Sequence, residues 1–119
     1  MKLAAIQMVS ATCVQANLAA AHQLLCEAAA QGAEVAVLPE YFCIMGLKDT
    51  DKLALRETFG DGAIQGFLSR TAKELGLWIV GGTLPLASGD PGRARNSSLA
   101  FAPSGVCVAR YDKMHLFRF

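Results

Sequence analysis

A chain of 119 residues has room for one modest domain, and its composition excludes several classes of protein. Hydrophobic residues make up 53% of the chain and charged residues 18%, whereas disordered segments combine low hydrophobicity with high net charge. The net charge of +1 gives no electrostatic basis for binding nucleic acid or an anionic membrane. No stretch reaches the ~18 uninterrupted apolar residues of a membrane-spanning helix.

The four cysteines show no metal-binding or disulfide pattern. They include no C-x-x-C pair, and no histidine lies at zinc-site spacing. Secreted disulfide scaffolds are usually shorter and denser in cysteine. We therefore expect reduced cysteines, mostly buried as small hydrophobic residues, in a cytoplasmic protein. The four are Cys13, Cys26, Cys43 and Cys107.

The first forty residues predict a strand, a helix and a second strand. Residues 3–9 form a short apolar stretch of the kind found in a buried strand. Asn17 can cap a helix over residues 17–31, which Gly32 ends. Residues 35–38 form a continuous apolar run, which is typical of a strand covered on both faces. We therefore expect a βαβ unit whose helix buries the face made of Leu18, Ala21, Leu25 and Ala28.

The middle of the chain predicts a loop, a second helix and a third strand. Residues 41–62 lack a clean period and contain three glycines, which favours a loop with a short helical turn. Residues 63–75 place apolar side chains on one side of a helix, which Gly76 ends. Residues 77–80 follow as a buried strand, closed by two glycines.

The last third of the chain predicts a surface loop and a hairpin. Residues 86–95 contain a proline and two glycines, which is typical of a loop. Residues 97–102 and 106–111 have the pattern of strands, joined by a turn at 103–105. The whole pattern predicts an α/β fold with a mixed sheet. Residues 114–119 are rich in apolar side chains, unlike a frayed terminus, so we expect the domain to be incomplete.

Glu40 lies just past the strand predicted at residues 35–38. In open α/β sheets, ligands bind outside the carboxyl ends of the strands. A carboxylate between Pro39 and aromatic residues is expected to be partly desolvated, which raises its pKa and suits a general base. The alternative is an ordinary surface glutamate at a strand end.

Lys113 lies among apolar and aromatic residues at the end of the hairpin's second strand. In a pocket its ammonium group can stabilise a developing oxyanion, whereas the alternative is a lysine with its head group in water. Since Glu40 also follows a strand, we expect the two head groups to lie within roughly 3–6 Å of each other. His22 and His115 have no metal partner at a recognisable spacing and are expected to be structural. Cys43 lies in a predicted loop, and we do not expect it to be a nucleophile.

The order and spacing of these segments resemble the nitrilase superfamily of carbon–nitrogen hydrolases. LPEYF at 38–42 is similar to the family's first catalytic motif, whose glutamate is the general base. LWIVGGT at 77–83 looks like the family's next buried strand, and residues 96–105 resemble its hairpin. YDKMHLF at 111–117 is similar to the second motif, whose lysine belongs to the catalytic triad. The resemblance runs through the whole chain and is closest to the ω-amidase-like and deaminated-glutathione-amidase-like branch.

The resemblance implies the N-terminal part of an α-β-β-α sandwich, as a carbon–nitrogen hydrolase domain over residues 1–119 that is incomplete at its C-terminus. It implies a Glu-Lys-Cys triad in which Glu40 and Lys113 are catalytic, with no cofactor and no metal. The family's cysteine follows the lysine motif after a further stretch, and none of the four cysteines present matches it. We therefore expect the complete protein to be an enzyme that hydrolyses small amides rather than nitriles and that forms homo-oligomers. We expect the 119-residue fragment alone to be inactive.

Two alternatives stay open at this stage. One is a non-catalytic remnant that keeps half of the fold. The other is an α/β domain that binds a small molecule at its strand ends. A separation of Glu40 from Lys113 in space would favour the second alternative.

Overall fold

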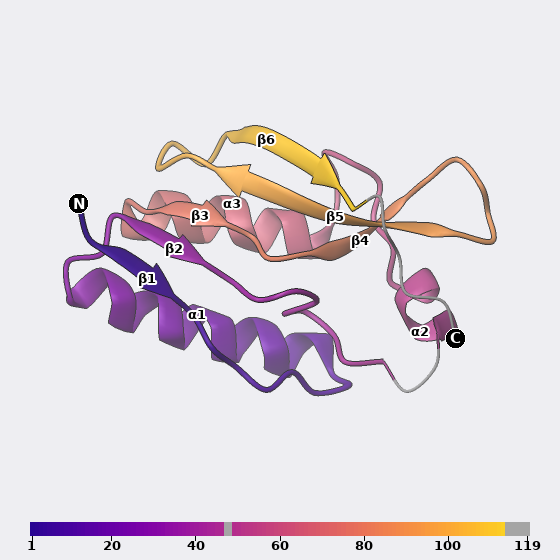
Figure 1. The fold of residues 1–119 in the computed structure, drawn as a ribbon, viewed down its shortest axis with the longest axis horizontal. Coiled ribbons are helices and arrows are strands. Elements are labelled where there is room, and N and C mark those ends of the chain that lie inside the picture. The colour runs from indigo at the N-terminus through magenta and orange to yellow at the C-terminus, as the bar shows by residue number, and fades with distance from the viewer. Residues whose placement is uncertain (47–48, 114–119) are drawn as a thin grey trace.

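The computed structural model describes residues 1–46 and 49–113, which form a six-stranded sheet and three helices. The elements are β1 (Leu3–Ala5), α1 (Val14–Ala30), β2 (Val35–Val37), α2 (Asp49–Ala54), α3 (Ala63–Leu75), β3 (Trp78–Val80), β4 (Leu84–Ala87), β5 (Ala94–Phe101) and β6 (Cys107–Asp112). The strand order is β1-β2-β3-β5-β4, and β6 pairs with the other edge of β5 (Figure 1). The first three strands are parallel, and β5 is antiparallel to β3, β4 and β6. The predicted α/β fold with a mixed sheet is confirmed.

The predicted βαβ unit is also confirmed, although its first strand is short. β1 pairs in parallel with β2, aligning Leu3 with Val35 and Ala5 with Val37. The prediction of a buried strand over residues 3–9 is wrong, because only three residues pair and Leu3 is 63% exposed. One face of this strand lacks a covering layer, so its apolar side chains alternate between the core and solvent.

Helix α1 buries the predicted face but begins before the predicted cap. It starts at Val14, and Gly32 follows it with a φ of 87°. Asn17 is therefore inside the first turn, where its buried side chain has another role. Its Oδ1 accepts a hydrogen bond from Ala11 N at 2.7 Å, and its Nδ2 donates to Cys43 O at 2.8 Å. The side chain thus satisfies backbone groups of two loops that lie far apart in the sequence.

Helix α3 spans the residues predicted for it, and its two ends have different causes. Gly76 adopts the left-handed conformation and ends the helix, as expected. At the other end the N–H groups of Ile64 and Gln65 donate to the carboxylate of Glu57. An acidic side chain from the preceding loop therefore satisfies the free N–H groups and complements the helix dipole.

The surface loop predicted at residues 86–95 is too long at both ends. Strands β4 and β5 pair Leu86 with Arg95, so that only residues 88–93 connect them. Pro85 lies within β4, the last strand in the order, where its missing N–H group does not interrupt a central ladder. The predicted hairpin is confirmed by the antiparallel pairing of β5 and β6 around residues 102–106.

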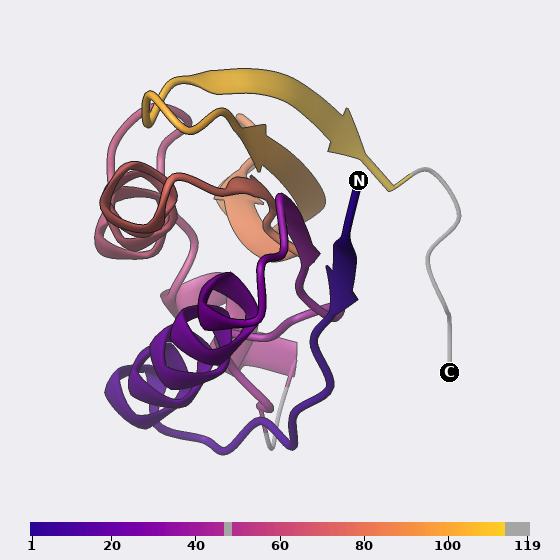
Figure 2. The same ribbon diagram turned by 90° about the vertical axis from the view of Figure 1, so that its left-hand side faces the viewer.

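Helices α1 and α3 cover the same face of the sheet (Figure 2). The core between these helices and the sheet contains Leu25, Leu68 and Ile79, all with no exposed surface. The opposite face carries apolar side chains that remain exposed, including Trp78 at 47% and Tyr111 at 58%. Strand β2, predicted to be covered on both faces, accordingly has only its middle residue buried.

All four cysteines are free thiols, but the expectation that most are buried is wrong. Cys43 is buried, Cys13 is exposed, and Cys26 and Cys107 are intermediate. Within residues 1–46 and 49–113, no helix has the length and hydropathy needed to cross a membrane.

Candidate active site

Three strands have their C-terminal ends on the same side of the sheet, and two of them lead directly to candidate site residues. Strands β2 and β3 are parallel, and β6 runs in the same direction because both it and β3 are antiparallel to β5. Glu40 lies three residues past β2, and Lys113 follows β6 immediately. The topology therefore brings residues 73 positions apart to the edge where ligands bind in open α/β sheets.

The head groups of Glu40 and Lys113 are in contact. Lys113 Nζ lies 3.0 Å from Glu40 Oε1, within the expected separation. The side chain of Asn96, on β5, donates from Nδ2 to the same oxygen at 2.7 Å. The Lys113 side chain is 29% exposed and that of Glu40 is 51% exposed. One carboxylate oxygen thus has two donors, while the group as a whole still contacts solvent.

The pKa of Glu40 lies below its ordinary value of 4.5, so the expected upward shift is wrong. The hydrogen bond from Lys113 lowers it most, followed by the hydrogen bond from Asn96. Desolvation raises the pKa, but less, because the carboxylate is half exposed. A depressed folded-state pKa means that the pair stabilises the fold at neutral pH. This contribution is lost as the pH falls below 4.5 and through the folded-state pKa.

The backbone around Glu40 is held in an uncommon conformation. Tyr41 has a φ of 48°, in the left-handed region that residues with a Cβ seldom adopt. Its N–H donates to Thr83 Oγ1 at 2.8 Å, which joins this turn to the residues after β3. Gly82, with a φ of 57°, lies so close to the carbonyl group of Pro39 that no Cβ fits between them. The surrounding contacts therefore fix the direction in which Glu40 leaves the sheet.

A cavity of about 410 Å³ lies beside the pair. Glu40, Lys113 and Asn96 form its polar end, and the remaining wall consists mainly of side chains from the uncovered sheet face. Ligand sites typically have volumes of roughly 300–1,000 Å³, so the space suits a small molecule. The lining residues are Val37, Leu38, Glu40, Val80, Gly82, Thr83, Asn96, Ser98, Tyr111 and Lys113.

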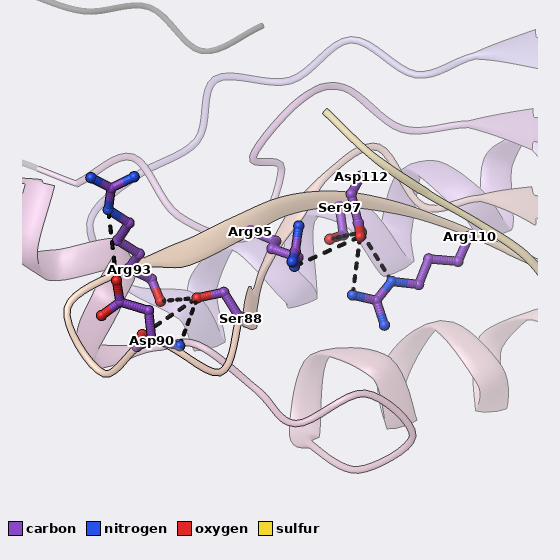
Figure 3. Close-up of polar contacts among 7 residues, drawn as sticks. All are labelled: Ser88, Asp90, Arg93, Arg95, Ser97, Arg110 and Asp112. Atoms are coloured by element: carbon purple, nitrogen blue, oxygen red, sulfur yellow. Dashed lines mark hydrogen bonds and ion pairs between the residues drawn. The ribbon is translucent and has the colours of Figure 1, made fainter. Parts of the chain in front are cut away.

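Asp112 anchors the strand end that carries Lys113 (Figure 3). Its carboxylate accepts hydrogen bonds from Arg110 Nε at 2.9 Å and from Ser97 Oγ at 2.6 Å. Arg95 Nε lies 3.9 Å from the second carboxylate oxygen. The hydrogen bond from Arg110 is the largest cause that holds the pKa of Asp112 below its ordinary value, followed by that from Ser97. This network joins β5 to β6 beside the candidate site.

Nothing in the local sequence pattern singles out Asn96 as a site residue. Its side chain donates to Glu40, and its backbone carbonyl oxygen accepts a hydrogen bond from Lys113 N at 2.8 Å. Its buried Oδ1 has no hydrogen-bond partner among the described residues. A buried amide oxygen with unused capacity next to a cavity suits a donor from a ligand or water. The one available signal is a buried polar residue in a strand, and it carries no role by itself.

We expect Asn96→Asp to raise the pKa of Glu40. The substitution replaces a donor by a second carboxylate of the same shape, and two adjacent carboxylates cannot both ionise easily. A pH titration of the Glu40 side-chain carboxyl by NMR measures the change. Ser98→Ala is the matched control, because it alters the same cavity wall without changing a charge. An unchanged Glu40 titration in Asn96→Asp would show that the amide does not control this carboxylate.

The remaining candidates lie apart from this site or outside the described residues. Cys43 is fully buried, and desolvation raises its pKa to about 12, whereas a nucleophilic thiol needs a lowered pKa. Cys43 therefore suits the structural role expected for it. His22 is half exposed and contacts Glu74 on α3. His115 lies outside the described residues, as does the rest of the segment 114–119.

Comparison with known proteins gives matches along almost the whole chain. The family model for carbon–nitrogen hydrolases matches residues 2–118. The chain is 37% identical over 115 residues to deaminated glutathione amidase of Synechocystis sp., covering 96% of this chain and 42% of that protein. It is 34% identical over 117 residues to Omega-amidase NIT2 of Homo sapiens, covering 98% and 41%. The chain thus spans about two fifths of the length of these curated relatives.

Solved structures share the fold. Nit3 of Saccharomyces cerevisiae, a member of branch 10 of the nitrilase superfamily, matches with a TM-score of 0.84 and 24% identity. That match covers 97% of this chain and 44% of Nit3. The NitFhit protein of C. elegans matches with a TM-score of 0.81 and 26% identity, covering 98% and 28%. The arrangement of helices and strands is therefore that of nitrilase-superfamily proteins.

Proposed function

Because the chain belongs to the carbon–nitrogen hydrolase family, we propose that it supplies two catalytic groups of an enzyme for small amides. Glu40 is the general base, and Lys113 stabilises the oxyanion. The observation that carries this proposal is the 3.0 Å contact between the two head groups beside a cavity of small-molecule size. The amidases among the relatives support amides over nitriles as substrates.

The first half of the proposed reaction transfers a proton and forms a covalent bond. Glu40 is ionised at neutral pH, since its pKa is lowered, and it can accept the proton of a cysteine thiol. The thiolate attacks the amide carbon, and the carbonyl oxygen gains the negative charge. Lys113 places its ammonium group beside this oxygen, a kind of contact worth roughly 3–4 kcal/mol in related oxyanion sites.

The second half releases the products. The C–N bond breaks as Glu40 returns its proton to the nitrogen, so ammonia leaves and a thioester remains. Glu40 then takes a proton from water, and the resulting hydroxide attacks the thioester. The acid leaves, and the thiol regains its proton. Asn96 keeps the carboxylate oriented throughout, because it is the neutral donor in contact with Oε1.

We assign the nucleophile to a cysteine other than the four in this sequence. The described residues that line the cavity include no cysteine, and the pKa of Cys43 is raised rather than lowered.

Ammonia release from small ω-amides tests the proposed function. We expect turnover by the protein expressed from its complete coding sequence and none by residues 1–119 alone. Loss of the nucleophile from a catalytic triad can reduce turnover by about 10⁶-fold. Turnover by residues 1–119 that Cys43→Ala abolishes would assign the nucleophile to Cys43 instead. An inactive complete protein that still binds amides would make the site a binding site without catalysis.

A further inference from the structure

A second group of reactive side chains lies on the helical layer, away from the sheet face that forms the cavity. His22 and Cys26 are one turn apart on α1, and Glu74 is in the last turn of α3. Side chains at positions i and i+4 lie on the same face of a helix, so both α1 residues can point toward one neighbour. Their ligand atoms and a carboxylate oxygen of Glu74 all lie within 4.8 Å of one another.

We propose that His22, Cys26 and Glu74 bind one zinc-like divalent cation between α1 and α3. The distance from His22 Nε2 to Glu74 Oε1 is 3.0 Å, and Cys26 Sγ lies 3.8 Å from each ring nitrogen of His22. Around tetrahedral zinc, bonds of about 2.0–2.3 Å place neighbouring ligand atoms roughly 3.3–3.6 Å apart. The separations of 3.0 and 3.8 Å lie on either side of this value, and all three ligand atoms lie within 4.8 Å of one another, so the side chains need to adjust around a bound ion.

The three donor types select a class of cation. Thiolate sulfur, imidazole nitrogen and carboxylate oxygen are all ligands of Zn²⁺, whereas Ca²⁺ and Mg²⁺ take oxygen ligands. A thiolate and a carboxylate together carry two negative charges, which a divalent ion neutralises. Three protein ligands leave a fourth position for water. All three side chains retain some solvent exposure, so an ion can reach them.

The helices hold these groups on a rigid base. Ala21 and Leu25 directly precede His22 and Cys26 on α1, and both are fully buried in the core. The ring of His22 also packs edge-on against Phe67 of α3, with 6.4 Å between the ring centroids. Sites built on packed helices keep their geometry better than sites on loops. Spacing in the sequence did not reveal this group, because Glu74 is 52 residues away from His22.

Titration of the purified protein with Co²⁺, a spectroscopic substitute for Zn²⁺, tests the proposal. We expect one equivalent to bind with a near-ultraviolet thiolate-to-metal absorption band, which Zn²⁺ displaces. Cys26→Ser should abolish the band, whereas the matched control Cys13→Ser, at an exposed cysteine outside the site, should keep it. Glu74→Gln should weaken Co²⁺ binding by about tenfold or more, since it removes a ligand.

Thermal unfolding distinguishes loss of the ligand from loss of the fold. Each variant should melt near the wild-type temperature without metal. Zn²⁺ should raise the melting temperature of wild type and Cys13→Ser, raise that of Glu74→Gln less, and leave that of Cys26→Ser unchanged. A Co²⁺ band that persists in Cys26→Ser would overturn the proposal. So would absence of saturable binding by the folded wild-type protein, which would leave a hydrogen-bonded cluster between two helices.

Discussion

Replacing Glu40 with glutamine is expected to lower the rate of amide hydrolysis by about 10²–10⁴-fold, the range typical of a general base. Glutamine keeps the shape of the side chain and can still accept a hydrogen bond from Asn96, but it cannot take the thiol proton. The loss should therefore fall mainly on kcat. Steady-state kinetics of ammonia release by the complete protein measure it.

Two further variants make this result specific. Glu34→Gln removes an exposed carboxylate beside the opposite end of β2 and should leave the rate unchanged. Lys113→Met should lower the rate by about 10²–10³-fold through loss of the oxyanion contact. Combining it with Glu40→Gln should cost far less than the product of the two effects, because the groups act as a unit. Full activity in Glu40→Gln would exclude Glu40 as the base.

Gly82→Ala is expected to destabilise the fold by about 2–4 kcal/mol. The added methyl group would overlap the carbonyl group of Pro39 and would also disfavour the positive φ of 57°. Backbone atoms surround this position, so a change of side-chain rotamer cannot relieve the overlap. Because Pro39 precedes Glu40, activity should fall together with stability. Urea denaturation measures the free energy of unfolding.

Gly89→Ala separates the two causes of that effect. Gly89 also has a positive φ, of 87°, but an added Cβ meets no atom within 4 Å. It should therefore lose only about 1 kcal/mol, the cost of the backbone conformation alone. Equal losses in the two variants would mean that the contact with Pro39 contributes nothing.

The elements that the sequence predicts well are those with local causes. Helix α3 has its apolar residues on one side and a glycine at its end, so both its extent and its end follow from neighbouring residues. Strand β4 has no such pattern, because Pro85 interrupts it and its pairing partner lies across a loop. The role of Asn17 depends in the same way on Cys43, 26 residues further along the chain.

The same distinction between local and long-range causes applies to the candidate site. The close approach of Glu40 and Lys113 can be predicted, because each follows a strand end in a segment that resembles a family motif. The direction of the Glu40 pKa shift cannot be predicted from the sequence. It depends on hydrogen bonds from Asn96, which is 56 positions away, and from Lys113, which is 73 positions away. The hydrogen bond from Ser97 to Asp112 cannot be predicted either, because it forms only when β5 and β6 pair.

The pairing of β5 has a consequence for motion at the site. At Asn96 this strand is engaged on both edges, by Pro85 of β4 and by the N–H of Lys113. Amide hydrogens in such a strand exchange with solvent only when the sheet opens, whereas residues beyond strand ends open at lower free energy. Asn96 is thus the member of the trio whose backbone opens last, because Glu40 and Lys113 lie beyond the ends of their strands. Ordering a substrate there costs conformational entropy mainly in the two charged side chains.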